Sequence, residues 1–260
     1  MLTRRGFVAG TLAALAVSRE ARAFGQEGAF HPRVLVTGGQ KWTGPRSTAP
    51  GRWSWELVRR TSAPARLVPT QVAADDPKLV AEPFVLWVGE ADVAPLTATE
   101  MAGLRRFIDL GGVLVVDDSN PENGAFGRAA RREILRVLPE SQVVRLMARN
   151  GGDVQEEHVI YKSYYLIDRP VGRVQGPPYV EAILRGSDAQ VLFLQHDLMG
   201  ALARAPEGTW RFEAEPGGAE QREYAVRFAV NLAMYVLCSN YKDDQVHAQA
   251  LMRRRGRAQP

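Results

Sequence analysis

Two adjacent carboxylates, Asp117 and Asp118, directly follow the apolar run 113–116 and precede Ser119. Such a run is typical of a buried strand, and open α/β sheets place their ligand crevice at the carboxyl ends of their strands. Neighbouring carboxylates there could hold a divalent cation, or one of them could act as a general base beside a binding residue. The alternative is structural, because either carboxylate could instead accept backbone N–H groups and cap the following turn.

Two histidines add acid–base chemistry to this set. His196 and Asp197 follow a second apolar run, 190–194, and are therefore expected at the same edge of the sheet as Asp118. His158 lies in a stretch rich in tyrosine, where an imidazole could act as a proton shuttle or a metal ligand. We take Asp118, His158 and Asp197 as the candidate catalytic residues. The structural alternatives are a partly buried histidine at position 158 and a polar strand end at 196–197.

A further group of residues is suited to ligand binding. The glycine pair Gly38-Gly39 closes the first apolar run, and its backbone N–H groups could face a ligand oxyanion. No complete glycine-rich nucleotide motif surrounds the pair, so nucleotide binding is not expected. No cofactor is expected, although the carboxylates could hold a divalent metal, whose ligands stay unassigned. The candidate ligand-binding residues are Gly38, Gly39, Trp42, Asp117, Tyr165 and His196.

The elements that must position these residues follow from apolar patterns. Residues 84–89 and 113–116 are continuous apolar runs typical of strands buried on both faces. Between them, Thr97 and Glu100 form a capping box that begins a helix ending at Gly111-Gly112. Residues 223–239 form a last helix that is apolar nearly all round. The alternation predicts an α/β domain with a mainly parallel sheet of roughly five or six strands and helices on both faces.

The N-terminus predicts export. Residues 1–23 combine the pair Arg4-Arg5, followed by Gly6-Phe7, with a short apolar segment and a small-x-small site ending at Ala23. This pattern resembles a twin-arginine signal peptide, which would direct the chain to the periplasm. We therefore expect a signal peptide over 1–23, a single α/β domain over 24–240 and a basic tail over 241–260.

Composition narrows the classes of partner. The 260-residue chain has 45% hydrophobic residues and a formal charge of +4, but residues 1–23 supply a net +3 of that charge. The tail 253–257 supplies four more positive charges, which leaves the folded body slightly negative and argues against nucleic acid. The longest apolar run is too short to span a bilayer, so no transmembrane helix is expected in the mature chain. The arginine-rich tail and the small apolar patch 250–252 suggest a weak contact with a partner or membrane surface; the alternative is a solvated end.

Four motifs occur in order along the chain: Gly38-Gly39 with Trp42, Asp117-Asp118, His158 with Ser163-Tyr164-Tyr165, and Asn231. With these motifs, the chain from residue 31 to about residue 240 resembles the bacterial family called domain of unknown function 4159. The resemblance implies a flavodoxin-like α/β fold similar to that of class I glutamine amidotransferases, and no established activity. Glutaminase relatives carry a cysteine on the turn that here holds Asp117, Asp118 and Ser119. The only cysteine, Cys238, lies in the last helix, where we expect it to be a small core residue, so glutaminase activity is not expected.

Two functions from different classes remain open. The first is a non-catalytic binding or scaffold module of the cell envelope, whose partner would be an envelope protein, a small molecule or a carbohydrate. The second is a hydrolase or carbohydrate-active enzyme that uses Asp118, His158 and Asp197, with or without a divalent metal. Convergence of these three side chains on one pocket would favour the enzyme, and separation into different packed regions would favour the binding module.

Overall fold

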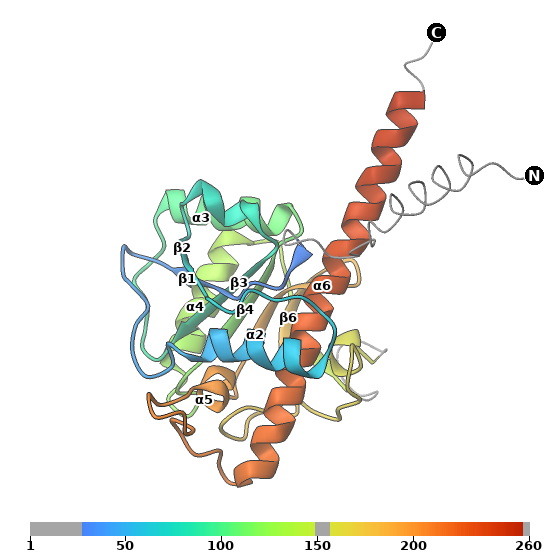
Figure 1. The fold of residues 1–260 in the computed structure, drawn as a ribbon. Helices are drawn as coiled ribbons and strands as arrows, with labels where there is room; N and C mark the ends of the chain where they lie inside the picture. Colours follow the sequence, from blue (N-terminus) through green and yellow to red (C-terminus); the bar gives the residue numbers. More distant parts are fainter. Residues whose placement is uncertain (1–27, 149–156, 257–260) are drawn as a thin grey trace, which may run out of the picture.

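The computed structural model describes residues 28–148 and 157–256, with side chains described as far as residue 239. One mixed sheet of seven strands forms the centre of the molecule (Figure 1), in the order β2-β1-β3-β4-β7-β6-β5. The strands are β1 (Arg33–Val36), β2 (Gln71–Ala73), β3 (Phe84–Gly89), β4 (Val113–Asp118), β5 (Val143–Met147), β6 (Tyr179–Arg185) and β7 (Asp188–Leu194). The helices are α2 (Ala49–Arg60), α3 (Ala98–Asp109), α4 (Ala125–Val137), α5 (Leu198–Leu202) and α6 (Gly218–Gly256), with the short 3-10 helices η2 (Pro77–Ala81) and η3 (Val159–Tyr161).

The predicted α/β class and the mainly parallel sheet are confirmed, and the expected strand number is too low. Strand β6 is the single antiparallel strand, since it pairs antiparallel with both β7 and β5 while every other neighbouring pair is parallel. The turn between β6 and β7 contains Gly186 at φ 63, a conformation that glycine adopts without steric cost. The turn joins β6 and β7 into a β-hairpin. At the other side of the sheet, the three-residue β2 adds a further short strand.

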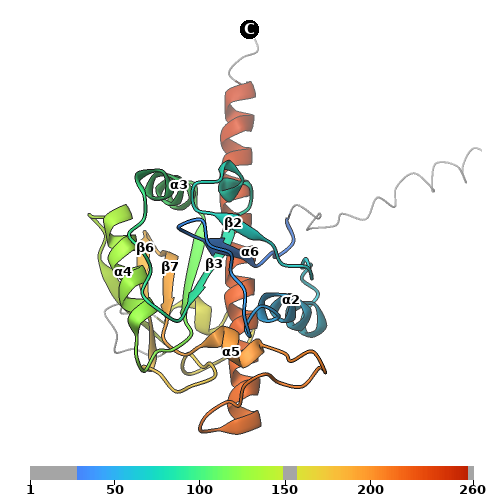
Figure 2. The ribbon, with the colours of Figure 1, turned by 90° about the vertical axis from the view of Figure 1, so that its left-hand side faces the viewer.

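Alternate residues of the central strands pack into two separate cores. In β4, Val113 and Val115 face the core covered by α2, α5 and α6, whereas Leu114 and Val116 face the core covered by α3 and α4. Figure 2 shows these two helix layers on opposite sides of the sheet. Both faces of the central strands are therefore buried, which explains why their sequences are continuous apolar runs.

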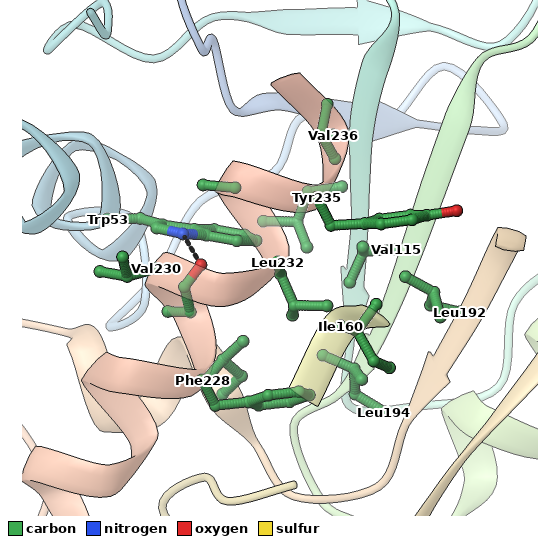
Figure 3. Packing of buried hydrophobic residues seen from close by; sticks show 14 of the residues in the cluster. Trp53, Val115, Ile160, Leu192, Leu194, Phe228, Val230, Leu232, Tyr235 and Val236 are labelled. Carbon is green, nitrogen blue, oxygen red and sulfur yellow. Dashed lines mark hydrogen bonds between the residues drawn. The ribbon is translucent and has the colours of Figure 1, made fainter. Parts of the chain in front are cut away.

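Helix α6 contributes most of one core. Figure 3 shows Phe228, Leu232 and Tyr235 of α6 packed beside side chains of β4 and β7, with Trp53 of α2 on the other side of the helix. The buried Trp53 indole donates a 2.7 Å hydrogen bond to the carbonyl oxygen of Ala229, which satisfies its only polar atom. This contact joins α2 to α6 across 176 residues of sequence.

The last helix is longer than predicted. It begins at Gly218 and continues to Gly256, so it includes most of the segment expected to be a tail, and Figure 1 shows its final turns projecting beyond the sheet. Cys238 of this helix is exposed, and its expected place in the core is wrong. Among the described side chains of α6, Leu237 is the last buried one. The surface contact expected of residues 250–252 lies outside the described side chains. The expected signal peptide, residues 1–23, lies outside the described residues.

The predicted capping box is present and fixes the start of α3. The Thr97 hydroxyl accepts from the N–H of Glu100, and the Glu100 carboxylate accepts from the N–H of Thr97 at 2.9 Å. The other oxygen of Glu100 accepts from the N–H of Gly38 at 2.6 Å. These hydrogen bonds outweigh the partial burial of the carboxyl and lower the pKa of Glu100. The helix start therefore also holds the loop that follows β1.

Among the residues that the structure describes, no helix is both long enough and apolar enough to cross a membrane.

Candidate functional site

The carboxyl ends of β4 and β7 bring together most of the predicted site residues. These two strands are parallel neighbours, and their register pairs Asp117 with Leu194. Asp118 ends β4, and His196 and Asp197 follow β7 within three residues. The sequence-based expectation that these side chains share one edge of the sheet, called the carboxyl edge below, agrees with the structure.

Asp197 is the centre of the carboxyl edge. Its side chain is fully buried, and its backbone has φ 51 and ψ 61, the left-handed region that asparagine and aspartate tolerate better than most residues. The carboxylate accepts from the N–H of Gly200 at 2.9 Å and so caps helix α5. A Cβ atom at position 200 would lie 2.2 Å from an Asp197 oxygen, so glycine is needed for this close approach.

Two arginines from distant loops complete the surroundings of Asp197. Arg46 donates from Nε and Nη2 to the two carboxylate oxygens at 2.8 and 2.7 Å, and Arg173 donates from Nε to Oδ2. The Phe212 ring lies beneath both guanidinium groups, 4.5 Å from Arg46 and 5.7 Å from Arg173. Every lone-pair direction of Asp197 therefore faces a donor of the chain itself, which leaves no free oxygen to act as a base.

Asp117 binds the start of α5. The fully buried carboxyl accepts from the N–H groups of Leu198 at 2.9 Å and Met199 at 2.7 Å. Burial, together with the negative charge of Asp197, raises the pKa of Asp117 above its usual range, while the two N–H donors and Arg46 act in the opposite direction. Its two oxygens thus serve the free N–H groups of a helix end.

Asp118 has a comparable structural role on the other side of the sheet. One oxygen accepts from the N–H of Asn120 at 2.9 Å and the other from the N–H of Gly127 at 3.0 Å. Burial raises the pKa of this carboxyl, and the same two N–H groups oppose that shift. Asp118 therefore ties the loop after β4 to the first turn of α4, as the capping alternative predicted.

The glycine pair after β1 makes a turn whose first amide is already bonded. Gly38 and Gly39 have φ 61 and 67, and the N–H of Gly38 donates to Glu100. Trp42 is held by two backbone hydrogen bonds to the side chain of Gln71, at 2.9 and 2.7 Å. This loop lies at the same edge of the sheet and leads to Arg46, which the structure joins to Asp197.

His196 lies beside a cavity at the carboxyl edge. The imidazole is buried, and its Nε2 lies 2.8 Å from the carbonyl oxygen of Pro177, so this nitrogen carries the proton. A cavity of about 420 Å³ is lined by His196 together with Arg169, Gln175, Gln221 and Tyr224. Burial lowers the pKa of His196 to about 4, so the imidazole is neutral at pH 7.

The lowered pKa of His196 predicts a loss of stability in mild acid. The pKa of a histidine is about 6.5 in an unfolded chain, so the unfolded state binds more protons than the folded state between pH 6.5 and pH 4. The unfolding free energy therefore keeps its full value, as far as His196 is concerned, above pH 6.5 and decreases as the pH falls toward 4. From pH 7 to pH 5, we expect the difference in unfolding free energy between wild type and His196→Gln to change by about 2 kcal/mol against the wild type. Urea denaturation at both values measures the difference, and an unchanged difference would contradict a neutral buried His196.

His158 and Tyr165 do not join the carboxyl edge. His158 is buried, its Nδ1 accepts from the N–H of Ile160 at 3.3 Å, and its ring packs against Tyr235. The Tyr235 hydroxyl bonds to the backbone of Ala189 at the start of β7, so His158 lies about 20 Å, one strand length, from Asp197. Burial lowers the pKa of His158. The backbone N–H of Tyr165 donates to Asn231 at 2.7 Å, and the Tyr165 side chain is half-buried near α6.

The donors of the carboxyl edge do not form a metal site. No group of three or more histidine, cysteine, aspartate or glutamate side chains suited to a metal ion occurs within the described residues. The carboxylates of Asp117, Asp118 and Asp197 each face backbone N–H groups or arginines, which compete with a cation. The residues present therefore do not fit a divalent metal at this place.

Sequence reasoning missed the arginines. Arg46 stands in a loop rich in glycine, proline and serine, and it contacts Asp197 across 151 residues of sequence. Arg173 lies 24 residues before the same carboxylate, in a segment with no periodic pattern. The one signal in the sequence is Asp197, which follows a buried strand. A buried carboxylate implies a cationic partner, but the sequence does not indicate which residue supplies it.

Comparison with known proteins identifies a family whose description names no activity. The family model described as "Domain of unknown function (DUF4159)" matches residues 33–237, a range that includes every strand of the sheet and all the residues of the carboxyl edge. No match is found among the curated proteins.

Proposed function

Because the chain belongs to the DUF4159 family, whose description names no activity, we propose its function from its own residues: a non-catalytic binding or scaffold module of the cell envelope. The observation that carries this proposal is the saturation of Asp197, whose buried carboxylate is bonded by Arg46, Arg173 and the N–H of Gly200. A general base needs a free lone pair within reach of a substrate proton.

The positions of the other candidate residues support the same proposal. Asp118 uses both oxygens to bind backbone N–H groups, and His158 packs near the opposite ends of the strands. At the turn where glutaminases carry their nucleophile, the chain has Asp117, Asp118 and Ser119. Cys238 stands 20 residues beyond the start of α6, which corresponds to about 30 Å along the helix axis. These placements argue against the hydrolase and glutaminase alternatives.

The fold and the location that we propose extend what the family match gives. Strands β2, β1, β3, β4 and β7 follow one another in the order of a flavodoxin-like sheet, with β6 and β5 added at one side. Export through the twin-arginine pathway rests on Arg4-Arg5 and the site after Ala23. A folded module delivered to the periplasm in this way would meet envelope proteins, carbohydrates or small molecules as its partners, with the basic C-terminal segment as a weak surface contact.

A paired experiment tests the proposal. In host cells, we expect the tagged wild-type chain to be shortened to begin at Phe24 and to be cross-linked to a discrete envelope component. The double variant Arg4→Lys/Arg5→Lys keeps both charges but is expected to stay unprocessed and to lose the cross-link. Mass spectrometry of the fractions measures both results.

Assays of hydrolytic activity on the purified chain test the alternative function, a hydrolase or carbohydrate-active enzyme. Purified protein is expected to release no product from chromogenic esters, phosphoesters and glycosides, and Asp118→Asn is expected to keep the cross-linked component. A turnover that Asp118→Asn abolishes, in a variant whose circular dichroism matches wild type, would contradict the proposed function and favour the hydrolase.

A further inference from the structure

A second cavity, of about 410 Å³, lies between α2, the segment 204–217 and the start of α6. We call it the Trp210 groove. It is separate from the cavity of His196, with which it shares no lining residue. Its most prominent lining residues are arginines and one tryptophan: Arg52, Arg59, Arg60, Arg222 and Trp210.

Guanidinium groups surround the Trp210 ring. Arg204 lies 3.5 Å from the ring centre, Arg222 4.5 Å and Arg52 5.3 Å. A backbone bridge between Arg204 and Trp210 forms the base of this segment and fixes the ring against α2 and α6. Three cations around one ring are individually attracted by its π face, yet they repel one another.

The arginine and tryptophan contacts continue along α2. Arg52 also lies 3.8 Å from the ring centre of Trp55, and Arg59 lies 4.9 Å from the same ring. The cations of the groove therefore form an alternating series in which each tryptophan stands between guanidinium groups. Arg59 is at the exposed end of the series, where a ligand in the groove can reach it.

Acidic side chains neutralise only part of this charge. The buried Glu56 binds Arg52 and Arg60, and Glu223 binds Arg60 through two hydrogen bonds of 2.8 and 2.7 Å. Glu213 is the third acidic residue of the lining. Four arginines line the groove against three glutamates, which leaves a surplus of one positive charge, and Arg204 adds a further guanidinium group behind the Trp210 ring.

Burial and mutual repulsion both disfavour the charged form of two of these arginines. Burial is the main cause that lowers the pKa of Arg204 and of Arg222, and neighbouring guanidinium groups lower both further. Gly218 and Ala219, at the positive end of the helix α6, also line the groove. An anion in this place would relieve a charge excess that the chain itself does not neutralise.

We propose that the Trp210 groove binds a small molecule that carries two negative charges on oxygen, as a phosphomonoester or a dicarboxylate does. Guanidinium groups match the planar geometry of carboxylates and phosphates, and the volume is that of an ordinary small-molecule site. This inference rests on the proposed function as a binding module and names the chemical class of one ligand.

Calorimetric titration of the full chain at fixed ionic strength tests the groove with glucose 6-phosphate, succinate and neutral glucose. We expect saturable binding of at least one dianion and none of glucose, and the two dianions distinguish phosphate from carboxylate recognition. Arg59→Glu is expected to weaken binding at least about tenfold, since it reverses a charge beside the ligand. Arg106→Glu, an exposed arginine on α3 at the opposite face, is the matched control and is expected to change binding less than about twofold.

Two results would overturn the inference: absence of saturable binding by either dianion, or equal weakening by Arg59→Glu and Arg106→Glu, which would indicate general charge screening. These failures are distinguishable from a failure of the proposed function. A chain that keeps its envelope cross-link while the groove stays empty loses only the groove assignment. Release of phosphate from glucose 6-phosphate that Arg59→Glu weakens and Arg106→Glu does not would instead confirm the groove as a dianion site and contradict the non-catalytic function.

Discussion

Replacing Asp197 with alanine is expected to lower the free energy of unfolding by about 3–5 kcal/mol, the largest loss that we expect from any single substitution in the carboxyl edge. The variant leaves Arg46 and Arg173 without their shared carboxylate, and it removes the cap that Asp197 gives to α5. It also places alanine in a left-handed backbone conformation. Urea denaturation followed by circular dichroism measures the loss.

Two controls separate these causes. Asp197→Asn keeps an oxygen for the cap and a residue that tolerates positive φ, so the cost that remains reports the lost charge. Asp92→Ala removes an exposed carboxylate that contacts only one partly exposed arginine, Arg132, and it is expected to cost less than about 1 kcal/mol. A loss at Asp197 no greater than that at Asp92 would show that the buried ion pairs contribute no net stability.

Asn231→Ala is expected to cost about 3 kcal/mol, the second largest effect. The buried amide oxygen accepts from the N–H groups of Tyr164 and Tyr165 at 3.2 and 2.7 Å. The amide nitrogen donates to the carbonyl oxygens of Ile160 and Tyr165 at 3.0 and 2.8 Å. One side chain thus supplies four hydrogen bonds to the backbone of residues 160–165, and a net contribution of roughly 0.5–1 kcal/mol from each accounts for the expected loss.

The neighbouring Arg227 provides the matched comparison for Asn231. It lies one turn earlier on α6 and pairs with Glu223 at 2.9 Å on a partly exposed surface. Arg227→Ala is expected to cost less than about 1 kcal/mol, because exposed ion pairs contribute little. Equal unfolding free energies for the two variants would mean that solvent replaces the hydrogen bonds of Asn231 without loss.

Local patterns in the sequence predicted the parts of the fold that depend on neighbouring residues. The capping box of Thr97 and Glu100 acts within one helical turn, and both of its hydrogen bonds are present. The apolar runs of β3 and β4 predicted strands buried on both faces, and their side chains do alternate between two cores. The apolar runs of β4 and β7 predicted that Asp117, Asp118 and Asp197 share one edge, because parallel neighbouring strands end together.

Contacts between distant residues could not be predicted. The pairing of Arg46 with Asp197 depends on how a loop after β1 approaches β7, which is a property of the whole sheet. His158 was grouped with Asp118 because an imidazole in a tyrosine-rich stretch could supply acid–base chemistry, but a histidine in a loop gives no indication of which end of the sheet it approaches. Cys238 was expected in the core because α6 is apolar nearly all round, but an apolar pattern does not show which side of the helix is covered, and Cys238 is exposed directly after the buried Leu237.

The position of α6 in the core has a consequence for how the chain acquires its structure. Trp53 bonds to Ala229, and Arg60 bonds to Glu223. Contacts of the first quarter of the chain therefore cannot form until its last quarter has been synthesised. During synthesis, the face of β3, β4 and β7 that α6 covers stays open to solvent until the ribosome has released most of the chain. We therefore expect folding to be slow and post-translational, with a nascent chain that needs a chaperone to protect this apolar face from aggregation.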